Sequence, residues 1–149
     1  MTKKRANTTR VCAINVNGIG AKNKSEKSLA LRKWMEQQRV DVMCMSEVNV
    51  NWAKVRNKDS LWERTKSWFE HRVIGVSYNV HNETYNSRQQ GGTATLLKDK
   101  IAHRHRDTGF DSSGLGRWSW ARISGKQGCT TRFVTVYCPV KSGSGGILT

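Results

Sequence analysis

Two short apolar runs on either side of a helical stretch set the strongest limit on how this chain can fold. The first run, residues 11–16 (V-C-A-I-N-V), stops at an Asn-Gly pair, which is typical of turns. The second run, residues 40–46 (V-D-V-M-C-M-S), is almost continuously apolar, as expected of a short strand covered on both faces. Between them, Asn23 and Glu26 match a capping box ahead of a helix that extends to about Arg39. A strand, a helix and a second strand in this order favour parallel pairing of the strands through a right-handed crossover.

The rest of the chain predicts a second helix followed by a β-rich, mainly antiparallel segment. Ser60 and Glu63 match another capping box, which predicts a helix there. Runs of strand-forming residues then occur at residues 72–78, 93–97, 117–123 and 131–136. We therefore expect one α/β domain over residues 11–140, between a disordered basic arm at residues 1–10 and a flexible end at residues 141–149.

The charge balance favours a polyanionic partner. Among 149 residues, 26 Lys and Arg stand against 11 Asp and Glu, which gives a formal net charge of +15. The chain holds no acidic residue after Asp111, and its first ten residues carry four basic side chains and no acidic one. Such a surface attracts phosphate backbones. We therefore expect a nucleic-acid partner, with DNA favoured over RNA. A merely soluble basic protein, or a basic localisation tail, is the alternative that the composition leaves open.

Other classes of protein fit the composition less well. No apolar run approaches the ~18–20 residues that a membrane span needs, and the polar, basic first ten residues predict no secretory signal. The four cysteines include no C-x-x-C pair, which argues against a structural zinc site or a redox motif. Free cysteines within apolar runs suit a reducing compartment. We expect an intracellular protein, nuclear or cytoplasmic, with no membrane partner.

Chemistry can be placed at the point where the two predicted parallel strands end. Alternation along the first strand puts Asn15 and Asn17 next to each other on one face at its carboxyl end. Glu47 is the first residue after the second apolar run. Open α/β sheets place their sites at this edge, and amide and carboxylate oxygens are hard ligands that suit Mg²⁺. The alternative is that Glu47 is simply the first solvated residue after a buried strand.

Four short motifs occur in sequence along the chain. They are I-N-V-N-G-I at residues 14–19, D-V-M-C-M-S-E at residues 41–47, G-G-T-A at residues 91–94 and R-F-V-T-V-Y-C-P at residues 132–139. In this order they resemble the endonuclease/exonuclease/phosphatase superfamily, which includes deoxyribonuclease I, apurinic/apyrimidinic endonucleases and the endonuclease domains of non-LTR retrotransposons. The chain departs from the family pattern at Ser46, where a glutamine is usual.

The resemblance implies a fold, a metal and a set of site residues. The fold would be the N-terminal half of a four-layered α/β sandwich, with a mixed sheet and helices on its outer face. Glu47 would be the main ligand of Mg²⁺ or Mn²⁺, with Asn17 beside the metal or its water. Asn15 would orient Glu47 or a phosphate oxygen, and Tyr137 would hydrogen-bond the scissile phosphate. We expect the nucleic-acid contacts from Asn17 and from basic residues of the acid-free tail, namely Arg117, Arg122, Lys126 and Arg132.

Two motifs from the second half of the family have no counterpart in the chain. These are the G-D-x-N segment, which supplies the water-activating Asp, and the closing D-H pair. We therefore expect the N-terminal part of a Mg²⁺-dependent phosphodiesterase, a nuclease for which a mobile element is one expected context. These 149 residues alone should show at most trace cleavage. The alternatives are a non-catalytic nucleic-acid-binding remnant and a partial gene product with no role of its own. The sequence encoded after Thr149 would distinguish them.

The absent motifs also lead to an expectation about packing. In the family, each half of the chain contributes mainly one of two packed sheets. We therefore expect the inner face of the sheet to be uncovered and to expose apolar side chains from residues 40–45 and 133–136. Because burying apolar surface is worth ~25 cal/mol per Å², such a chain would be marginally stable or self-associated.

Overall fold

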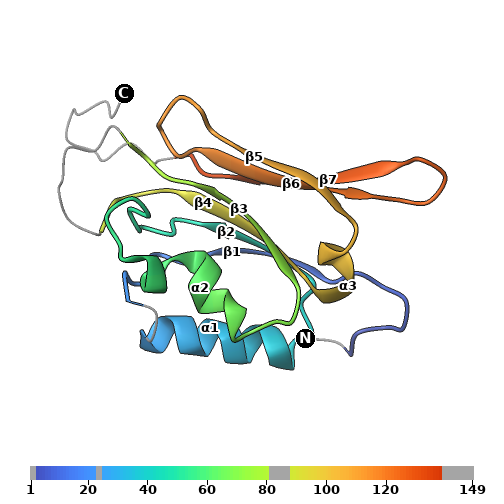
Figure 1. Ribbon diagram of the computed structural model, residues 1–149. Helices are drawn as coiled ribbons and strands as arrows, with labels where there is room; N and C mark the ends of the chain where they lie inside the picture. The colour runs from blue at the N-terminus through green and yellow to red at the C-terminus, as the bar shows by residue number, and fades with distance from the viewer. Residues whose placement is uncertain (1–2, 23–24, 81–87, 139–149) are drawn as a thin grey trace.

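The first β-sheet contains both strands of the predicted β-α-β unit (Figure 1). The computed structural model describes residues 3–22, 25–80 and 88–138. The sheet has the order β1-β2-β4-β3 and consists of β1 (Val11–Asn15), β2 (Val42–Ser46), β3 (Arg72–Ser77) and β4 (Thr93–Lys98). β1 and β2 are parallel and are connected through α1 (Glu26–Gln37), whereas β4 is antiparallel to both β2 and β3. The predicted pairing of the first two strands is confirmed, within a mixed sheet.

The N-terminus of α1 is capped by a different residue from the one predicted. Asn23, the predicted cap, lies outside the described residues, and Ser25 is the N-cap of the helix. Ser25 Oγ accepts a hydrogen bond from Ser28 N over 3.3 Å and donates one to Ile19 O over 2.8 Å. Ser25 therefore caps α1 and also fixes the loop that follows β1.

A second sheet packs against the first. It consists of β5 (His105–Phe110), β6 (Trp118–Ser124) and β7 (Thr130–Val136), in that order and all antiparallel. β5 lies over β3, β6 over β3 and β4, and β7 over β2 and β4. The opposite face of the first sheet is covered by α1 and α2 (Leu61–Lys66), so the described layers are helix, sheet and sheet (Figure 1). The short elements are η1 (Asn57–Asp59) and α3 (Asp99–Ala102).

The expectation of an uncovered inner face is wrong, because the chain itself supplies the sheet that covers it. Alternation along β2 directs Met43 and Met45 to the helices, and Val42 and Cys44 to the second sheet. The error lies in the expectation that this half of the chain contributes mainly one sheet: the predicted strands β6 and β7 pack over β2, β3 and β4 in a second sheet. The sequence of β5, H-R-D-T-G-F, was not predicted as a strand because it has a single large apolar residue. The α/β fold with a mixed sheet and helices on its outer face is confirmed.

Part of the layer between the two sheets is polar. Thr95 of β4 and Thr135 of β7 are buried, and their Oγ1 atoms lie 2.6 Å apart. Thr95 Oγ1 also donates to Ser119 O of β6 over 3.3 Å. Buried hydroxyls are stable when they have such partners. This pair joins the two sheets through a direct hydrogen bond.

Within the expected residues 133–136, the exposed apolar side chains lie on the outer face of β7 and not on the inner face of the sheet. Val134 and Val136, on the outer face of β7, are 50% and 64% exposed, and Val11 of β1 is 49% exposed. β7 packs on β2 and β4, which leaves Val11 on the margin of the sandwich. None of the helices in the described part of the chain is long and apolar enough to cross a membrane.

Residues 3–10 contact the domain, although the sequence predicted a disordered arm. Lys4 Nζ lies 2.5 Å from Asp41 Oδ2, and Arg10 N donates to the same oxygen over 2.6 Å. Arg10 Nη1 also donates to Gln38 O over 2.5 Å. These bonds place the arm beside the start of β2. The end of the chain, residues 141–149, lies outside the described residues.

Candidate active site

Three loops meet at the edge where β1 and β2 end. Backbone pairing continues past the two strands, since Gly18 N donates to Glu47 O over 2.6 Å. This bond places Asn17 beside Glu47. On the other side, Asn49 N donates to Gly91 O over 2.9 Å, which joins the loop after β2 to the turn before β4. Glu47 is therefore held between the loops that flank β2.

The backbone at this edge adopts an uncommon conformation. Asn17, Glu47 and Asn49 have positive φ angles of 40°, 52° and 54°. Asparagine tolerates the left-handed region, whereas a glutamate is rarely found there. Such a residue costs ~1–3 kcal/mol and persists only where its surroundings hold it. At Glu47 the cross-loop hydrogen bond from Gly18 does so.

Asn15 fixes the turn that carries Asn17. Its Oδ1 accepts a hydrogen bond from Asn17 N over 2.9 Å, which is an Asx-turn. Lys27 Nζ, from α1, donates to Asn17 O over 2.8 Å. Both asparagine side chains are exposed at the end of β1. The Asn15 side chain and the Asn17 backbone are thus held in place by local bonds, and both residues are accessible to a ligand.

Two further polar residues at this edge were missed in the sequence. Asn49 Oδ1 accepts a hydrogen bond from Gly91 N over 2.7 Å. Gln89, whose N donates to Asn49 O over 3.3 Å, is buried, and its side-chain amide has no partner among the described residues. Buried amides normally have partners. The available signal was the position of Asn49, two residues after Glu47, but its role depends on the fold of the later turn.

Tyr137 reaches the same edge from the second sheet. Its ring packs on Gly91, where an added Cβ would lie only 3.2 Å from Tyr137 Cε1. Burial raises the pKa of the Tyr137 hydroxyl above its usual value, and the proximity of the Glu47 carboxylate and the Cys138 thiol raises it further. The hydroxyl therefore stays protonated at neutral pH and is a hydrogen-bond donor. Through Gly91, Tyr137 therefore lies at the same edge as Asn49, which follows Glu47 by two residues.

Arg117 is the one basic residue of the predicted set that lies beside Tyr137. Its carbonyl oxygen accepts a hydrogen bond from Tyr137 N over 2.7 Å, and its side chain is exposed. Asp111 fixes the loop before it: Oδ2 accepts from Arg117 N and Oδ1 accepts from Ser113 N, each over 2.9 Å. Burial alone would raise the pKa of Asp111, but the bonds from Ser113 and Arg117 and the charge of Arg117 outweigh it and lower this pKa.

Replacing Asp111 with asparagine should destabilise the fold by ~1–3 kcal/mol at neutral pH, because one buried donor loses its acceptor. The folded-state pKa of Asp111 is lowered, so its carboxylate contributes fully above its unfolded pKa of ~4. That contribution is lost as the pH falls through the lowered pKa. Urea unfolding of both proteins at several pH values checks this, with Asp99→Asn, at a half-exposed position, as the control. An equal difference at pH 7 and pH 2 would contradict it.

The other predicted nucleic-acid contacts lie away from this edge. The register pairs Arg122 with Arg132, towards the hairpin turn that contains Lys126, whereas Tyr137 leaves the opposite end of β7. Arg122 Nε donates to Asp107 Oδ1 over 2.8 Å, and the Arg132 guanidinium lies 4.3 Å from the centroid of the Trp120 ring. Phosphate contacts from these residues stay predictions, and would form a surface separate from Glu47.

The donor set at the edge fits a hard divalent cation. It offers the Glu47 carboxylate and the amide oxygens of Asn15 and Asn17, which match the oxygen ligands of Mg²⁺ or Mn²⁺. Mg²⁺ commonly takes one or two carboxylates and keeps several waters. Within residues 3–22, 25–80 and 88–138, no cluster of three or more His, Cys, Asp or Glu could form a metal site from those residue types. Water or substrate oxygens would therefore have to complete the coordination.

The chain belongs to the endonuclease/exonuclease/phosphatase family, whose model matches residues 12–142. Among solved structures, it is similar to an AP endonuclease from Archaeoglobus fulgidus, with 20% identity, a TM-score of 0.50, and coverage of 79% of this chain and 38% of that one. It is also similar to an endonuclease/exonuclease/phosphatase family protein from Leptotrichia buccalis, with 16% identity, a TM-score of 0.56, and coverage of 89% of this chain and 56% of that one. No curated protein matches the sequence.

These likenesses support the fold. At such identities they concern the fold alone, and the chain spans between about two fifths and just over half of the length of these structural relatives. Family membership supports a hydrolytic, nuclease or phosphodiesterase type of function.

Proposed function

We propose that this chain is the N-terminal part of a Mg²⁺-dependent phosphodiesterase that cleaves nucleic acid, with DNA favoured over RNA. The observation that supports it is the gathering of Glu47, Asn17, Asn15 and Tyr137 at one edge of a chain with net charge +15. A long polyanion matches this charge better than a small phosphate ester does. The proposal includes an intracellular location, with a mobile element as one context.

Each residue at the edge has a role in this proposal. Glu47 and Asn17 would hold Mg²⁺ or Mn²⁺, which when bound neutralises negative charge on the phosphate oxygens. Asn15 orients the turn at Asn17 through its bond to that backbone. The neutral Tyr137 hydroxyl donates a hydrogen bond to a phosphate oxygen, and Arg117 contacts a neighbouring phosphate. We assign the activation of the attacking water to none of the residues described here.

A non-catalytic nucleic-acid-binding protein is the second candidate. The observation that favours it concerns the His, Cys, Asp and Glu side chains of the described residues. No three of them form a cluster that could both ligate a metal ion and provide a general base. The two candidates share the basic surface and differ in whether bound nucleic acid is cut.

Binding and cleavage assays test both candidates. A labelled DNA duplex should bind the chain with log K falling steeply against log salt, because Lys and Arg displace counterions from phosphates. A small phosphomonoester at millimolar concentration should not displace the duplex, and RNA of the same sequence should bind more weakly. Plasmid nicking by the chain should be at most a trace and should need Mg²⁺ or Mn²⁺.

The outcomes separate the candidates. Affinity that is flat between low and moderate salt, or full displacement by the phosphomonoester, contradicts the nucleic-acid proposal. Salt-dependent binding without any nicking in Mg²⁺ or Mn²⁺ favours the second candidate. Nicking that persists in EDTA contradicts the role of the metal.

A further inference from the structure

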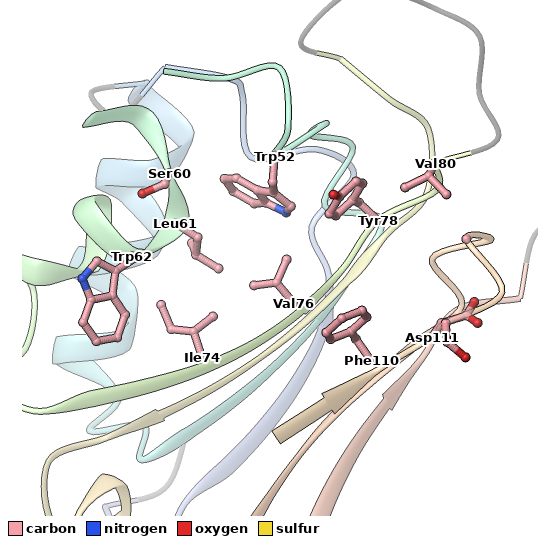
Figure 2. Close-up of a pocket in the computed structure, with 12 residues that line it drawn as sticks. Trp52, Ser60, Leu61, Trp62, Ile74, Val76, Tyr78, Val80, Phe110 and Asp111 are labelled. Carbon is pink, nitrogen blue, oxygen red and sulfur yellow. The ribbon is translucent and has the colours of Figure 1, made fainter. Parts of the chain in front are cut away.

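An apolar cavity of about 440 Å³ lies beside β3, between α2 and β5 (Figure 2). Its walls are mainly aromatic and aliphatic, and include Trp52, Leu61, Trp62, Ile74, Val76 and Phe110. Figure 2 shows Ile74 and Val76 rising from β3 towards Leu61, with Phe110 facing them from β5. Phe110 is 61% exposed. A cavity of this size accommodates one large apolar side chain with its flanking backbone.

The cavity adjoins a strand edge with backbone groups available for pairing. β3 is the last strand of its sheet and pairs with β4. Asp99 N donates to His71 O over 2.8 Å, so these two residues form a hydrogen-bonded pair of the antiparallel β3–β4 ladder. Hydrogen-bonded pairs recur at every second residue, and the backbone groups of Val73 and Gly75 therefore point towards β4. Alternation then directs the N–H and C=O groups of Ile74 and Val76 outward, at the mouth of the cavity. Exposed edges of this kind readily accept a further strand.

A buried donor in the cavity wall also lacks an acceptor. Trp52 Nε1 is buried and has no hydrogen-bond partner among the described residues. In Figure 2 the indole nitrogen faces the side of the cavity on which Tyr78 and Val76 lie. Buried indole N–H groups usually have a partner. A ligand that brings a carbonyl oxygen into the cavity could supply one after a small shift of the ring.

The chemistry of the cavity favours a peptide over a nucleic acid. Among the described residues that line it, Asp111 is the only charged one, and none is a lysine or arginine. A phosphate inside the cavity would lack a cationic partner. Acidic residues that flank an inserted apolar side chain would instead lie outside the cavity, where Arg72 of β3 packs on Trp62 with its guanidinium 4.0 Å from the ring centroid. A second copy of the chain would bring another +15 charge against the first. We propose that β3 binds an extended peptide segment of an acidic partner protein by strand addition, with one large apolar side chain of that segment in the cavity.

A designed peptide tests the proposal. The probe is a fluorescein-labelled peptide of sequence E-D-V-F-V-D-E, measured against the full chain by fluorescence anisotropy and by amide hydrogen exchange. We expect saturable binding, with slower exchange at Ile74 and Val76, whose N–H groups point outward. Exchange at Val73 and Gly75 should change little, because these already pair with β4.

Matched controls isolate each part of the interaction. Replacing the central Phe of the peptide with Ala, N-methylating its backbone, or making Phe110→Ala in the protein should each weaken binding by about tenfold or more. Val134→Ala, at a 50% exposed site on the outer face of β7, should leave it unchanged, as should Glu47→Gln. A peptide with lysine in place of the acidic residues should bind more weakly.

Several results would overturn the proposal. These are no binding at millimolar peptide, equal binding to the Phe110→Ala protein, equal binding of the lysine peptide, or displacement of the peptide by a short oligonucleotide. A dimer that forms through β3 and excludes the peptide would also overturn it. Failure of the peptide to bind β3 would leave the proposed function at Glu47 unaffected, because peptide binding is measured with a different probe from DNA and metal binding.

Discussion

Replacing Glu47 with glutamine should remove divalent-cation binding at the strand-end edge. Glutamine keeps the size of the side chain but loses the carboxylate, which is the strongest hard ligand there. Loss of partners that merely orient metal ligands already costs ~10–100-fold in affinity, so loss of the ligand should cost at least as much. Any Mg²⁺-dependent nicking should fall to the level seen with EDTA.

Paramagnetic broadening by Mn²⁺ is the measurement, since it detects weak binding and needs no turnover. In the unaltered protein, amide signals of Gly18, Asn49 and Gly91 should broaden first, because these residues pair around Glu47. The Glu47→Gln protein should lose this pattern. Glu36→Gln, at a half-exposed carboxylate on α1, is the matched control and should retain it. Unchanged broadening in the Glu47 variant would assign the metal to other ligands.

Replacing Arg64 with methionine should destabilise the protein by ~3–5 kcal/mol. Arg64 is fully buried, and its guanidinium donates to Asp59 O and to Gly20 O, over 2.7 Å each. It also donates to Ala21 O over 2.5 Å. Methionine fills similar space but leaves the buried Asp59 carbonyl and the part-buried Gly20 and Ala21 carbonyls without this donor, which is the costly event. Burial lowers the pKa of Arg64 to about 10, against the opposing charge of Asp59, so the group stays charged at neutral pH.

Tryptophan fluorescence during urea unfolding measures this loss. The matched control is Arg32→Met, because Arg32 is partly exposed on α1 and its ion pair with Glu36 spans 3.0 Å. That change should cost less than ~1 kcal/mol. Gly20 and Ala21 belong to the loop after β1, so hydrogen exchange in that loop should also rise in the Arg64 variant. If Arg64→Met lowered the free energy of unfolding by less than ~1 kcal/mol, the proposed role of the Arg64 hydrogen bonds would be contradicted.

The part of the fold with clear periodicity was predictable from the sequence. The strands ending at Asn15 and Ser46 and the helix between them follow from apolar spacing alone, and their parallel pairing follows from the crossover. β5 was not predictable on these grounds, because it is an edge strand with one large apolar residue, Phe110. β6 and β7 were predicted as strands, but their packing over β2, β3 and β4 in a second sheet depends on long-range contacts that local patterns do not show.

The candidate site, too, was predictable from the sequence only in part. The positions of Asn17 and Glu47 directly after two neighbouring strands were readable, because parallel strands end at one edge. The contacts of Asn49 and Tyr137 with Gly91 were not, since they depend on positive φ angles and on a turn far along the chain. Likewise, the pairing of Arg122 with Asp107 depends on the strand register and on an irregularity between His105 and Asp107.

The hydroxyl pair between the sheets has a mechanical consequence for the edge. Glu47 follows a strand of the first sheet and Tyr137 follows a strand of the second, so their separation changes if one sheet slides along the other. The Thr95–Thr135 hydrogen bond, at 2.6 Å, resists that shear within the buried layer. A slide of one full residue repeat, ~3.3 Å, would break it. In the proposed function, the separation of Glu47 and Tyr137 would therefore depend on how the two sheets are aligned, and the Thr95–Thr135 hydrogen bond helps to hold that alignment from within the buried layer.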